Sequence, residues 1–195
     1  MSMSKFDSSK YKGTSVQEWQ KVVKGWHKWI SVISDWSGPF TDQMLDLAGV
    51  APGRRVLDIA AGDGDQSMKA AQRVGPDGYM LATDISSNLL AFTAASAQEA
   101  GLNNLETQVM DAEHLELEDD SFDAVICRFG LMLLANVDKA MSEIYRVLKP
   151  GGHAAAVDLT THDKSPWLSI PAMIARKHAQ LPPPEPGQPG FPWCF

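Results

Sequence analysis

Several classes of protein are excluded by what this sequence lacks. Cysteine occurs only twice in 195 residues, at Cys127 and Cys194, which is too few for a disulfide scaffold or a thiolate metal site. The five histidines are scattered and form no pair at ligand spacing. No run approaches the roughly 18 apolar residues of a membrane-spanning helix, and residues 1–12 contain no apolar stretch of signal-peptide length. These absences predict a cytoplasmic protein without a metal site or an integral membrane segment.

Basic residues are also scarce and nowhere form a block. Seventeen Lys and Arg oppose 24 Asp and Glu, for a formal net charge of −7. Nucleic-acid binding depends on cations that neutralise phosphates, and electrostatic membrane attachment needs a basic cluster. We therefore expect no nucleic-acid partner. The hydrophobic content of 44% indicates one ordinary globular domain rather than a disordered chain.

The first 50 residues are predicted to be helical after a short arm. Residues 1–13 are polar and are predicted to form a flexible arm. A capping box, a serine followed three residues later by a glutamate, begins at Ser15 and predicts the start of a helix. Apolar residues then recur at spacings of three and four, and Gly38-Pro39 is expected to end the helix. Residues 14–50 are therefore predicted to form an N-terminal helical cap.

From residue 54 onward, short apolar runs alternate with helical patterns, which is typical of βαβ units around a parallel sheet. Strands are expected at Arg55–Ala60, Tyr79–Thr83, Glu106–Met110, Ala124–Cys127 and His153–Leu159. Helices are expected at about 65–74, 86–100, 137–148 and 167–180. The pattern predicts an α/β fold with a Rossmann-like, doubly wound, mostly parallel sheet over residues 51–180, and a proline-rich tail at 181–195. Such a sheet binds its ligand beyond the carboxyl ends of its strands.

The loop after the first strand is the most informative segment. Gly62 and Gly64 allow a sharp turn and a close approach of the backbone to a ligand. Three carboxylates surround the loop, those of Asp58, Asp63 and Asp65. They would repel the pyrophosphate of a dinucleotide, and the third glycine of the dinucleotide fingerprint is replaced by Ser67. The loop therefore favours a ligand with positive groups, although a purely structural turn, in which Asp65 caps the next helix, stays open.

This loop resembles motif I of class I S-adenosylmethionine-dependent methyltransferases. Its form, Ala60-Ala61-Gly62-x-Gly64-Asp65, is similar to that of the ubiquinone/menaquinone C-methyltransferase family. Many members of that family have glycine where Ala60 or Ala61 stands. The resemblance implies that S-adenosyl-L-methionine is the cofactor. It also implies that part of the binding site is formed by Asp58, Ala60, Gly62, Asp63 and Gly64.

Two later acids extend this site. Asp84 ends the second strand about twenty residues after the glycines, where an acid accepts ribose hydroxyls in this architecture. Ile85 is then expected to lie against the adenine. The resemblance implies that Asp111 accepts the adenine amino group and that the backbone N–H of Ala112 meets a ring nitrogen. The acids that follow, between residues 113 and 120, are interpreted as a solvated face.

The exit of the fourth strand, Arg128-Phe129-Gly130-Leu131, also resembles the family. Arg128 stands where relatives often have serine or asparagine near the methionine part of the cofactor. It is expected either to bind the α-carboxylate in a charge-assisted pair or to point to solvent. Phe129 is assigned to the substrate pocket, with Trp29 and Trp36 from the N-terminal helices. For the two tryptophans, packing on the core is the alternative.

The family's sheet ordinarily has seven strands, and its last two form a reversed hairpin that completes the substrate pocket. After Leu159 this sequence shows a helix and the tail but no strand pair. The fifth strand is therefore expected at an edge of the sheet. Exposed edges invite pairing with another chain, so a homo-oligomer, or weak activity with cofactor binding retained, is predicted.

The function predicted from these motifs is methyl transfer to a small-molecule acceptor such as a quinone precursor. A phenol or an enolisable carbon would also need a base, and the candidates near the end of the fifth strand are Asp158, His162 and Asp163. Two alternatives stay open. A non-catalytic or truncated cofactor-binding module is suggested by the missing hairpin, and an NAD-dependent oxidoreductase is disfavoured by the acidic loop.

Overall fold

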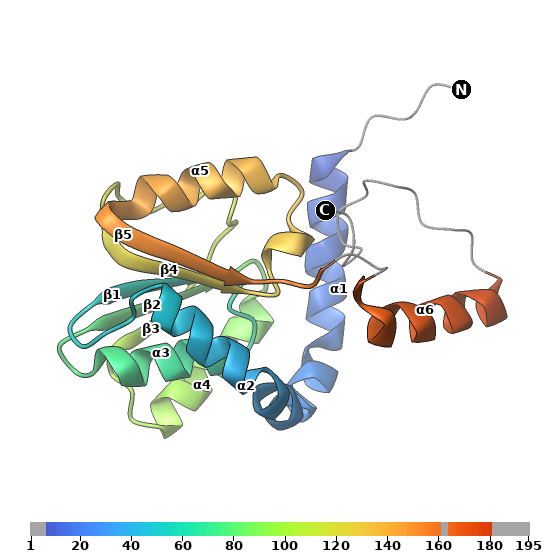
Figure 1. Cartoon of the computed structure of the whole chain (residues 1–195), viewed down its shortest axis with the longest axis horizontal. Helices are drawn as coiled ribbons and strands as arrows, with labels where there is room; N and C mark the ends of the chain where they lie inside the picture. Colours follow the sequence, from blue (N-terminus) through green and yellow to red (C-terminus); the bar gives the residue numbers. More distant parts are fainter. Residues whose placement is uncertain (1–6, 161–163, 181–195) are drawn as a thin grey trace.

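The computed structural model describes residues 7–160 and 164–180. Within them, five parallel strands form one sheet in the order β3-β2-β1-β4-β5 (Figure 1). The strands are β1 Arg55–Ile59, β2 Tyr79–Asp84, β3 Leu105–Val109, β4 Phe122–Arg128 and β5 Leu148–Val157. The strand order reverses between β1 and β4, which is the position where doubly wound sheets bind their ligands. The predicted Rossmann-like fold is confirmed.

Helices cover both faces of the sheet (Figure 1). They are α1 Ser8–Lys28, α2 Ile30–Leu47, α3 Asp65–Val74, α4 Ser87–Glu99, α5 Val137–Val147 and α6 Pro166–Ala179, with the short 3-10 helix η1 Leu131–Leu133. Apolar residues of α2, α3 and α4 pack against one face in one core cluster. Those of α5 and of the segment after β3 pack against the other face. Both faces are therefore buried, as the continuous apolar strands require.

The N-terminal helices differ from the prediction in two places. The first helix begins at Ser8, seven residues before Ser15, because Asp7 caps it by accepting the N–H of Lys10 at 3.1 Å. Residues 8–13 of the predicted arm are therefore helical, and residues 1–6 lie outside the described part. The chain breaks its helix at Trp29, and the predicted break at Gly38-Pro39 is wrong, because Pro39 lies inside α2. Proline has no N–H to donate within the helix. The turns after Pro39 are nevertheless buried against the sheet, and this packing stabilises the helix through the proline.

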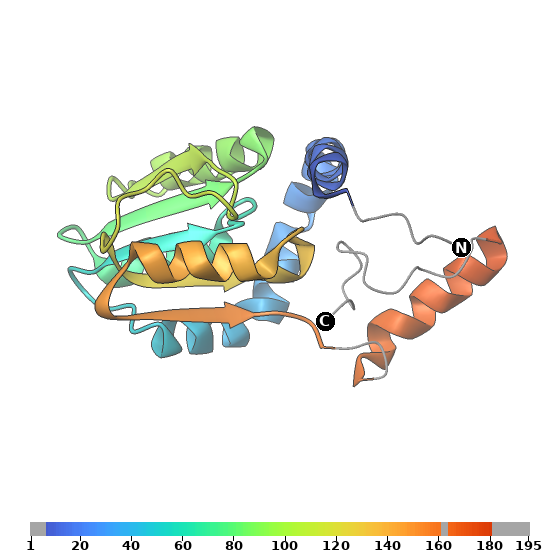
Figure 2. The same ribbon diagram turned by 90° about the horizontal axis from the view of Figure 1, so that it is seen from above.

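Helix α1 crosses beyond the carboxyl ends of the strands. Both views place it in front of the arrowheads of the sheet, across their direction (Figures 1 and 2). Helix α6 lies farther out, away from the sheet, in both views. No helix among the described residues has the length and apolar character needed to cross a bilayer.

Strand β5 forms one edge of the sheet, as predicted, and pairs only with β4 among the described strands. The pairing is irregular, because Phe122 faces Leu148 whereas Ala124 faces His153. The extra residues of β5 are the predicted turn Lys149–Gly152, with Gly151 at a φ of +79°. The strand therefore begins at Leu148, five residues earlier than the predicted start.

Candidate functional site

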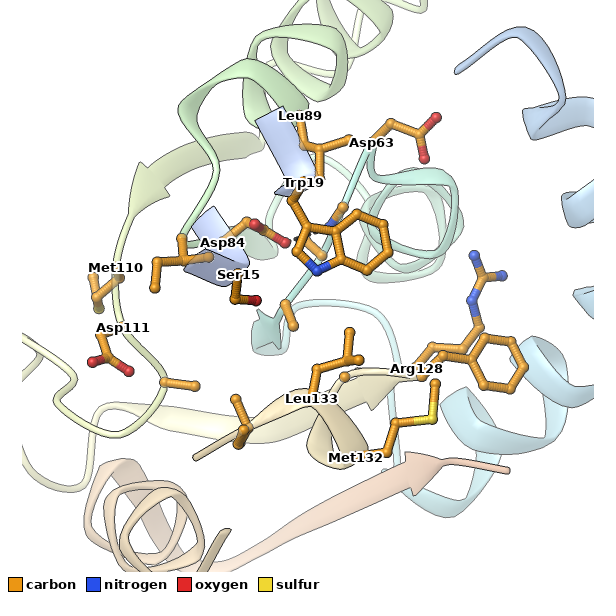
Figure 3. Close-up of a pocket in the computed structure, with 18 of the residues that line it drawn as sticks. Ser15, Trp19, Asp63, Asp84, Leu89, Met110, Asp111, Arg128, Met132 and Leu133 are labelled. Carbon is orange, nitrogen blue, oxygen red and sulfur yellow. Dashed lines mark hydrogen bonds between the residues drawn. The ribbon is translucent and has the colours of Figure 1, made fainter. Parts of the chain in front are cut away.

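A cavity of about 390 Å³ lies between α1 and the carboxyl ends of the strands (Figure 3). Helix α1 contributes Tyr11, Lys12, Ser15, Trp19 and Trp26 to its lining. The loops after β1, β2 and β3 contribute residues that include Ala60, Gly62, Asp63, Asp84, Ile85, Asp111 and Ala112. Most of the remaining wall is formed by Arg128, Phe129, Gly130 and residues 132–135, and α2 contributes Ile33. Most of the residues predicted to bind the cofactor are thus brought together around one space.

The glycine loop turns through left-handed backbone at two glycines that are needed for different reasons. Gly62 has a φ of +63°, and a Cβ built on it would meet no atom within 4 Å. Since Gly62 lines the cavity, a side chain there would enter space open to a ligand. Gly64 has a φ of +80°, and a Cβ built on it would clash with Cγ2 of Thr93. Gly64 therefore serves the packing of α4 and does not line the cavity.

Asp84 joins the end of β2 to the glycine loop. Its Oδ2 accepts the N–H of Gly62 at 2.9 Å, and its Oδ1 accepts the N–H of Ser86 at 2.8 Å. Burial raises the pKa of Asp84, and backbone N–H donors that include those of Ser86 and Gly62 oppose the shift. Each carboxylate oxygen keeps further acceptor capacity. The carboxylate is thus fixed at the cavity wall, where it can accept hydroxyl donors.

Asp111 carries a partner that the sequence did not indicate. Its Oδ1 accepts the N–H of Glu113 at 2.9 Å, and its Oδ2 accepts from Nζ of Lys12 at 2.7 Å. Lys12 also pairs with Oε2 of Glu113 at 2.6 Å. Asp111 and Ala112 line the cavity where the adenine was expected. A cation from α1 therefore lies at this end of the site.

Glu113 is the exception among the acids that were interpreted as a solvated face. It is buried, and its Oε1 accepts the N–H of Asn136 at 2.9 Å. The interpretation as part of a solvated face is therefore wrong for Glu113, whose second oxygen forms an ion pair with Lys12. It is confirmed for the four exposed acids Glu116, Glu118, Asp119 and Asp120.

Arg128 does not point to solvent, while its contact with the α-carboxylate of the cofactor stays a prediction. The side chain is buried, and Nη1 donates to Ser37 Oγ and Thr41 Oγ1, both at 2.8 Å, and to Asp65 Oδ2 at 2.9 Å. Nη2 pairs with the other oxygen of Asp65. Both Nη atoms are therefore engaged within the protein, so Arg128 fastens α2 to the start of α3 while forming part of the cavity wall.

Asp65 does not cap α3 with its side chain. Gly64 is the N-cap residue and no side-chain hydrogen bond caps the helix. The carboxylate of Asp65 instead pairs with Arg128 and accepts the hydroxyl of Ser34 at 2.7 Å. As the first residue of α3 it still lies at the positive end of the helix dipole.

Asp58 lies beneath the loop and not in the cavity. It is fully buried, and Ser67 Oγ donates to its Oδ2 at 2.5 Å. Burial raises the pKa of Asp58 from 3.8 to about 7, against the opposing effects of Ser67 and Arg128. Asp58 does not line the cavity, so the predicted direct contact with the cofactor is replaced by a contact that holds the first turn of α3.

Asp63 connects the glycine loop to α1. Its Oδ2 is buried without a hydrogen-bond partner and lies 3.6 Å from Nδ1 of His27, which also lacks one. Burial raises the pKa of Asp63, as does the charge of Asp65. The His27 ring stacks on Phe92 with centroids 4.0 Å apart. The end of α1 thus rests over the loop and over α4.

The aromatic wall of the cavity comes from other tryptophans than those expected. Trp29 and Trp36 are 57% and 47% exposed and do not line the cavity. Trp36 stacks on Phe129, with ring centroids 5.7 Å apart. Trp19 and Trp26 line it instead (Figure 3 shows Trp19). Trp19, Trp26 and Ile33 recur at intervals of seven and line the cavity, whereas Trp29 and Trp36 fall outside that stripe.

Asp158 alone among the three candidate bases lies in the described part of the chain. It follows β5, and its Oδ1 is buried without a hydrogen-bond partner. Burial raises the pKa of Asp158 to about 6, opposed by the N–H of Met132. Met132 lines the cavity but Asp158 does not. His162 and Asp163 lie outside the described residues.

Comparison with known proteins identifies the family. The model of the ubiE/COQ5 methyltransferase family matches residues 10–174. The chain belongs to this family. It is similar to the ubiquinone/menaquinone biosynthesis C-methyltransferase UbiE of Haemophilus ducreyi, with 38% identity over 117 residues, 60% of this chain and 45% of the relative. It is also similar to the demethylmenaquinone methyltransferase of Listeria welshimeri, with 34% identity over 128 residues, 66% of this chain and 54% of the relative.

A solved structure supports the fold. The match is a SAM-dependent methyltransferase from Aquifex aeolicus, with a TM-score of 0.56 and 24% identity, and it covers 78% of this chain and 72% of that one. The family and the class I methyltransferase fold expected from the motifs are therefore confirmed. The chain spans about half the length of the curated relatives it matches.

Proposed function

We propose that this chain binds S-adenosylmethionine in the cavity under α1 and transfers its methyl group to a neutral, apolar small molecule. The observation that carries the proposal is the charge of the lining. Among the described lining residues, the carboxylates are Asp63, Asp65, Asp84, Asp111 and Glu113. The cations are Lys12 and Arg128, and both are paired with these acids. A sulfonium and an ammonium suit such a cavity, whereas a pyrophosphate would be repelled.

The residues present fit this cofactor along the length of the cavity. Asp84 offers acceptor capacity to ribose hydroxyls, and Asp111 offers it to an adenine amino group. The open space above Gly62 leaves room for a ligand against the backbone. The methionine end would then lie toward Ala60 and Asp63, where the acidic side chains balance its positive charge. When bound, the cofactor supplies a methyl group activated by its sulfonium.

The chain's own contribution is alignment and exclusion of water. Helix α1 covers the cavity, and Trp19 and Trp26 present aromatic rings to it. Aromatic faces attract cations, so these rings suit a sulfonium. The remaining apolar wall, which includes Ile33, Met132 and Leu133, suits the ring of an aromatic acceptor. The quinone-related names of the relatives support a quinone precursor as that acceptor.

Methyl transfer is tested with a labelled donor and a panel of reduced benzoquinones and naphthoquinones. We expect label to enter at least one quinol and to depend on Asp84. The panel should include a carboxylated quinol as a matched acceptor, and the acidic lining predicts slower transfer to it. Transfer to the carboxylated quinol alone would contradict the proposed acceptor class.

A second candidate function is cofactor binding without catalysis. The observations that favour it are the free edge of β5 in the described sheet and the position of Asp158 outside the cavity lining. Cofactor binding without transfer to any acceptor of the panel would support this candidate over the enzyme.

A further inference from the structure

Helix α1 spans the cavity as a bridge supported at its two ends. The residues that face the cavity form a stripe at Tyr11, Lys12, Ser15, Trp19 and Trp26. Such spacings of about four and seven follow one face of a helix. The middle of this face therefore lies over open space and not over packed side chains. Packing of α1 on the rest of the protein is concentrated toward Val23, which is buried, and His27, which stacks on Phe92. None of the residues 8–21 is buried, and a helix segment with few packed contacts has low local stability, so the polar contacts near the start of α1 decide whether that part stays in place.

The contacts near the start of α1 are polar and specific. The hydroxyl of Tyr11 donates to the carbonyl of Leu133 at 2.9 Å. Lys12 bridges Asp111 at 2.7 Å and Glu113 at 2.6 Å. At the far end His27 stacks on Phe92. The ionic contacts of Lys12 thus join the bridge to the loop after β3.

The ion pairs of Lys12 with Asp111 and Glu113 differ from an ordinary surface ion pair. Exposed pairs contribute little, but the side chain of Glu113 is 4% exposed and that of Lys12 is 26% exposed. Burial of the ammonium lowers the pKa of Lys12, yet the hydrogen bonds and charges of Asp111 and Glu113 outweigh it and raise that pKa. Without Lys12, the hydrogen bond that the buried carboxylate of Glu113 keeps among the described residues is that from the N–H of Asn136. Loss of one partner of such a pair is costly.

We propose that Lys12 is a positioning residue that closes α1 over the adenine end of the cavity, orients Asp111 toward the base, and limits the rate at which the cofactor leaves. Asp111 has one acceptor site on Oδ1 occupied by Glu113 N–H and one on Oδ2 occupied by Lys12. Each oxygen keeps a second site, so an adenine amino group can bind while Lys12 stays paired. This inference rests on the proposed binding of S-adenosylmethionine.

The test compares Lys12→Met with Lys24→Met. Lys24 is an exposed residue of the same helix, so the control removes the same charge from α1. Dissociation of S-adenosylhomocysteine is followed by stopped-flow displacement, with the fluorescence of the tryptophans as the signal. We expect Lys12→Met to release the ligand about tenfold faster or more, in line with loss of charge-assisted hydrogen bonds. Lys24→Met should match the wild type, and Lys12→Arg should restore most of the slow release.

Hydrogen exchange of the ligand-free protein supplies a second readout. Amides of α1 should exchange faster in Lys12→Met than in Lys24→Met. Should Lys12→Met fail to fold, Lys12→Gln takes its place in both measurements. Equal release rates in the Lys12 and Lys24 variants would overturn the role in cofactor release, and equal exchange would overturn the closure of α1. A wild-type protein that binds no S-adenosylhomocysteine would instead contradict the proposed function, while the exchange measurement would still decide the closure.

Discussion

Ala60 adopts backbone that is unfavourable for a residue with a side chain. Its φ is +54°, while the neighbouring Ala61 is not among the residues with positive φ. Left-handed backbone costs an L-residue roughly 1–2 kcal/mol. This explains why glycine is suited to the position, and it shows that the loop geometry is imposed by its surroundings. Ala61 N–H donates to the carbonyl of Thr83 at 2.9 Å and anchors that geometry.

The two alanines provide a matched test of this strain. Ala60→Gly should leave the free energy of unfolding unchanged or raise it, because relief of strain offsets the greater freedom of the unfolded chain. Ala61→Gly should lower it by about 1 kcal/mol or more, since it loses a buried methyl group and gains only unfolded-state freedom. Urea denaturation of both variants measures the difference. Equal losses in the two variants would show that Ala60 carries no strain.

Asp84 is the residue on which cofactor recognition depends most. Replacing a buried charged acceptor by a neutral group costs roughly 1.5–3 kcal/mol. Asp84→Asn should therefore weaken the binding of S-adenosylhomocysteine by about tenfold to a hundredfold. The exposed Asp77→Asn is the control with the same change of charge. An unchanged dissociation constant in a folded Asp84→Asn variant would remove Asp84 from the site.

Asp58 makes stability depend on pH in the direction opposite to that of a salt-bridged acid. Because its pKa rises from 3.8 to about 7 on folding, the folded state favours the protonated carboxyl. Its contribution is complete below about pH 4 and is lost as the pH rises to about 7. The unfolding free energy of the wild type relative to Asp58→Asn should therefore fall by a few kcal/mol between pH 4 and 7 and then level off. A difference that stays constant or grows over this range would contradict the assignment.

At the scale of elements, the sequence predicted the sheet well because its signals are local. Helix α3 has the predicted bounds of 65–74, and β1 begins at Arg55 as expected. In these segments the apolar residues recur with a clear helix or strand period, and turn residues mark the ends of each segment. The start of α1 was missed because Asp7 is followed by a polar first turn without an apolar stripe. The continuation of α2 through Pro39 depends on tertiary packing that no local pattern reveals.

The candidate site was predicted in part for the same reason. Asp84 and Asp111 stand at the ends of strands, so their positions follow from the order of the elements. Lys12 was not found because its partner Asp111 lies 99 residues along the chain. Arg128 was assigned to the ligand or to solvent, since its contact with Asp65, 63 residues away, depends on how α2 and α3 meet. Ion pairs between residues far apart in the chain are thus the feature of the candidate site that the sequence alone does not predict.

We expect self-association at the outer edge of β5, which pairs with no strand in the described part of the chain. Its outer residues Ala154 and Ala156 are exposed, and α6 exposes Ile170, Met173 and Ile174. Unpaired strand edges bind other strands unless they are covered or carry charge. Sedimentation velocity should show an average mass that rises with protein concentration. Ala154→Lys places a charge on the strand and should lower the average mass at each concentration. Ser142→Lys, on the exposed side of α5, is the control, and a monomer at all concentrations would refute the expectation.

At the scale of the whole molecule, the charge of the chain and the charge of the cavity have the same sign. The net charge is −7, and the described lining adds five carboxylates against two paired cations. A negative potential over the mouth attracts cationic ligands and repels phosphates. This global property distinguishes the cavity from the dinucleotide sites that share its architecture.

The most direct test of the account is calorimetric titration of the wild-type chain with S-adenosylhomocysteine and, separately, with NADH. Both ligands carry an adenosine, but only NADH carries the pyrophosphate that the acidic lining is expected to repel. The account predicts binding of S-adenosylhomocysteine at one site per chain and no detectable binding of NADH. Binding of NADH with equal or greater affinity, or no binding of S-adenosylhomocysteine, would contradict it.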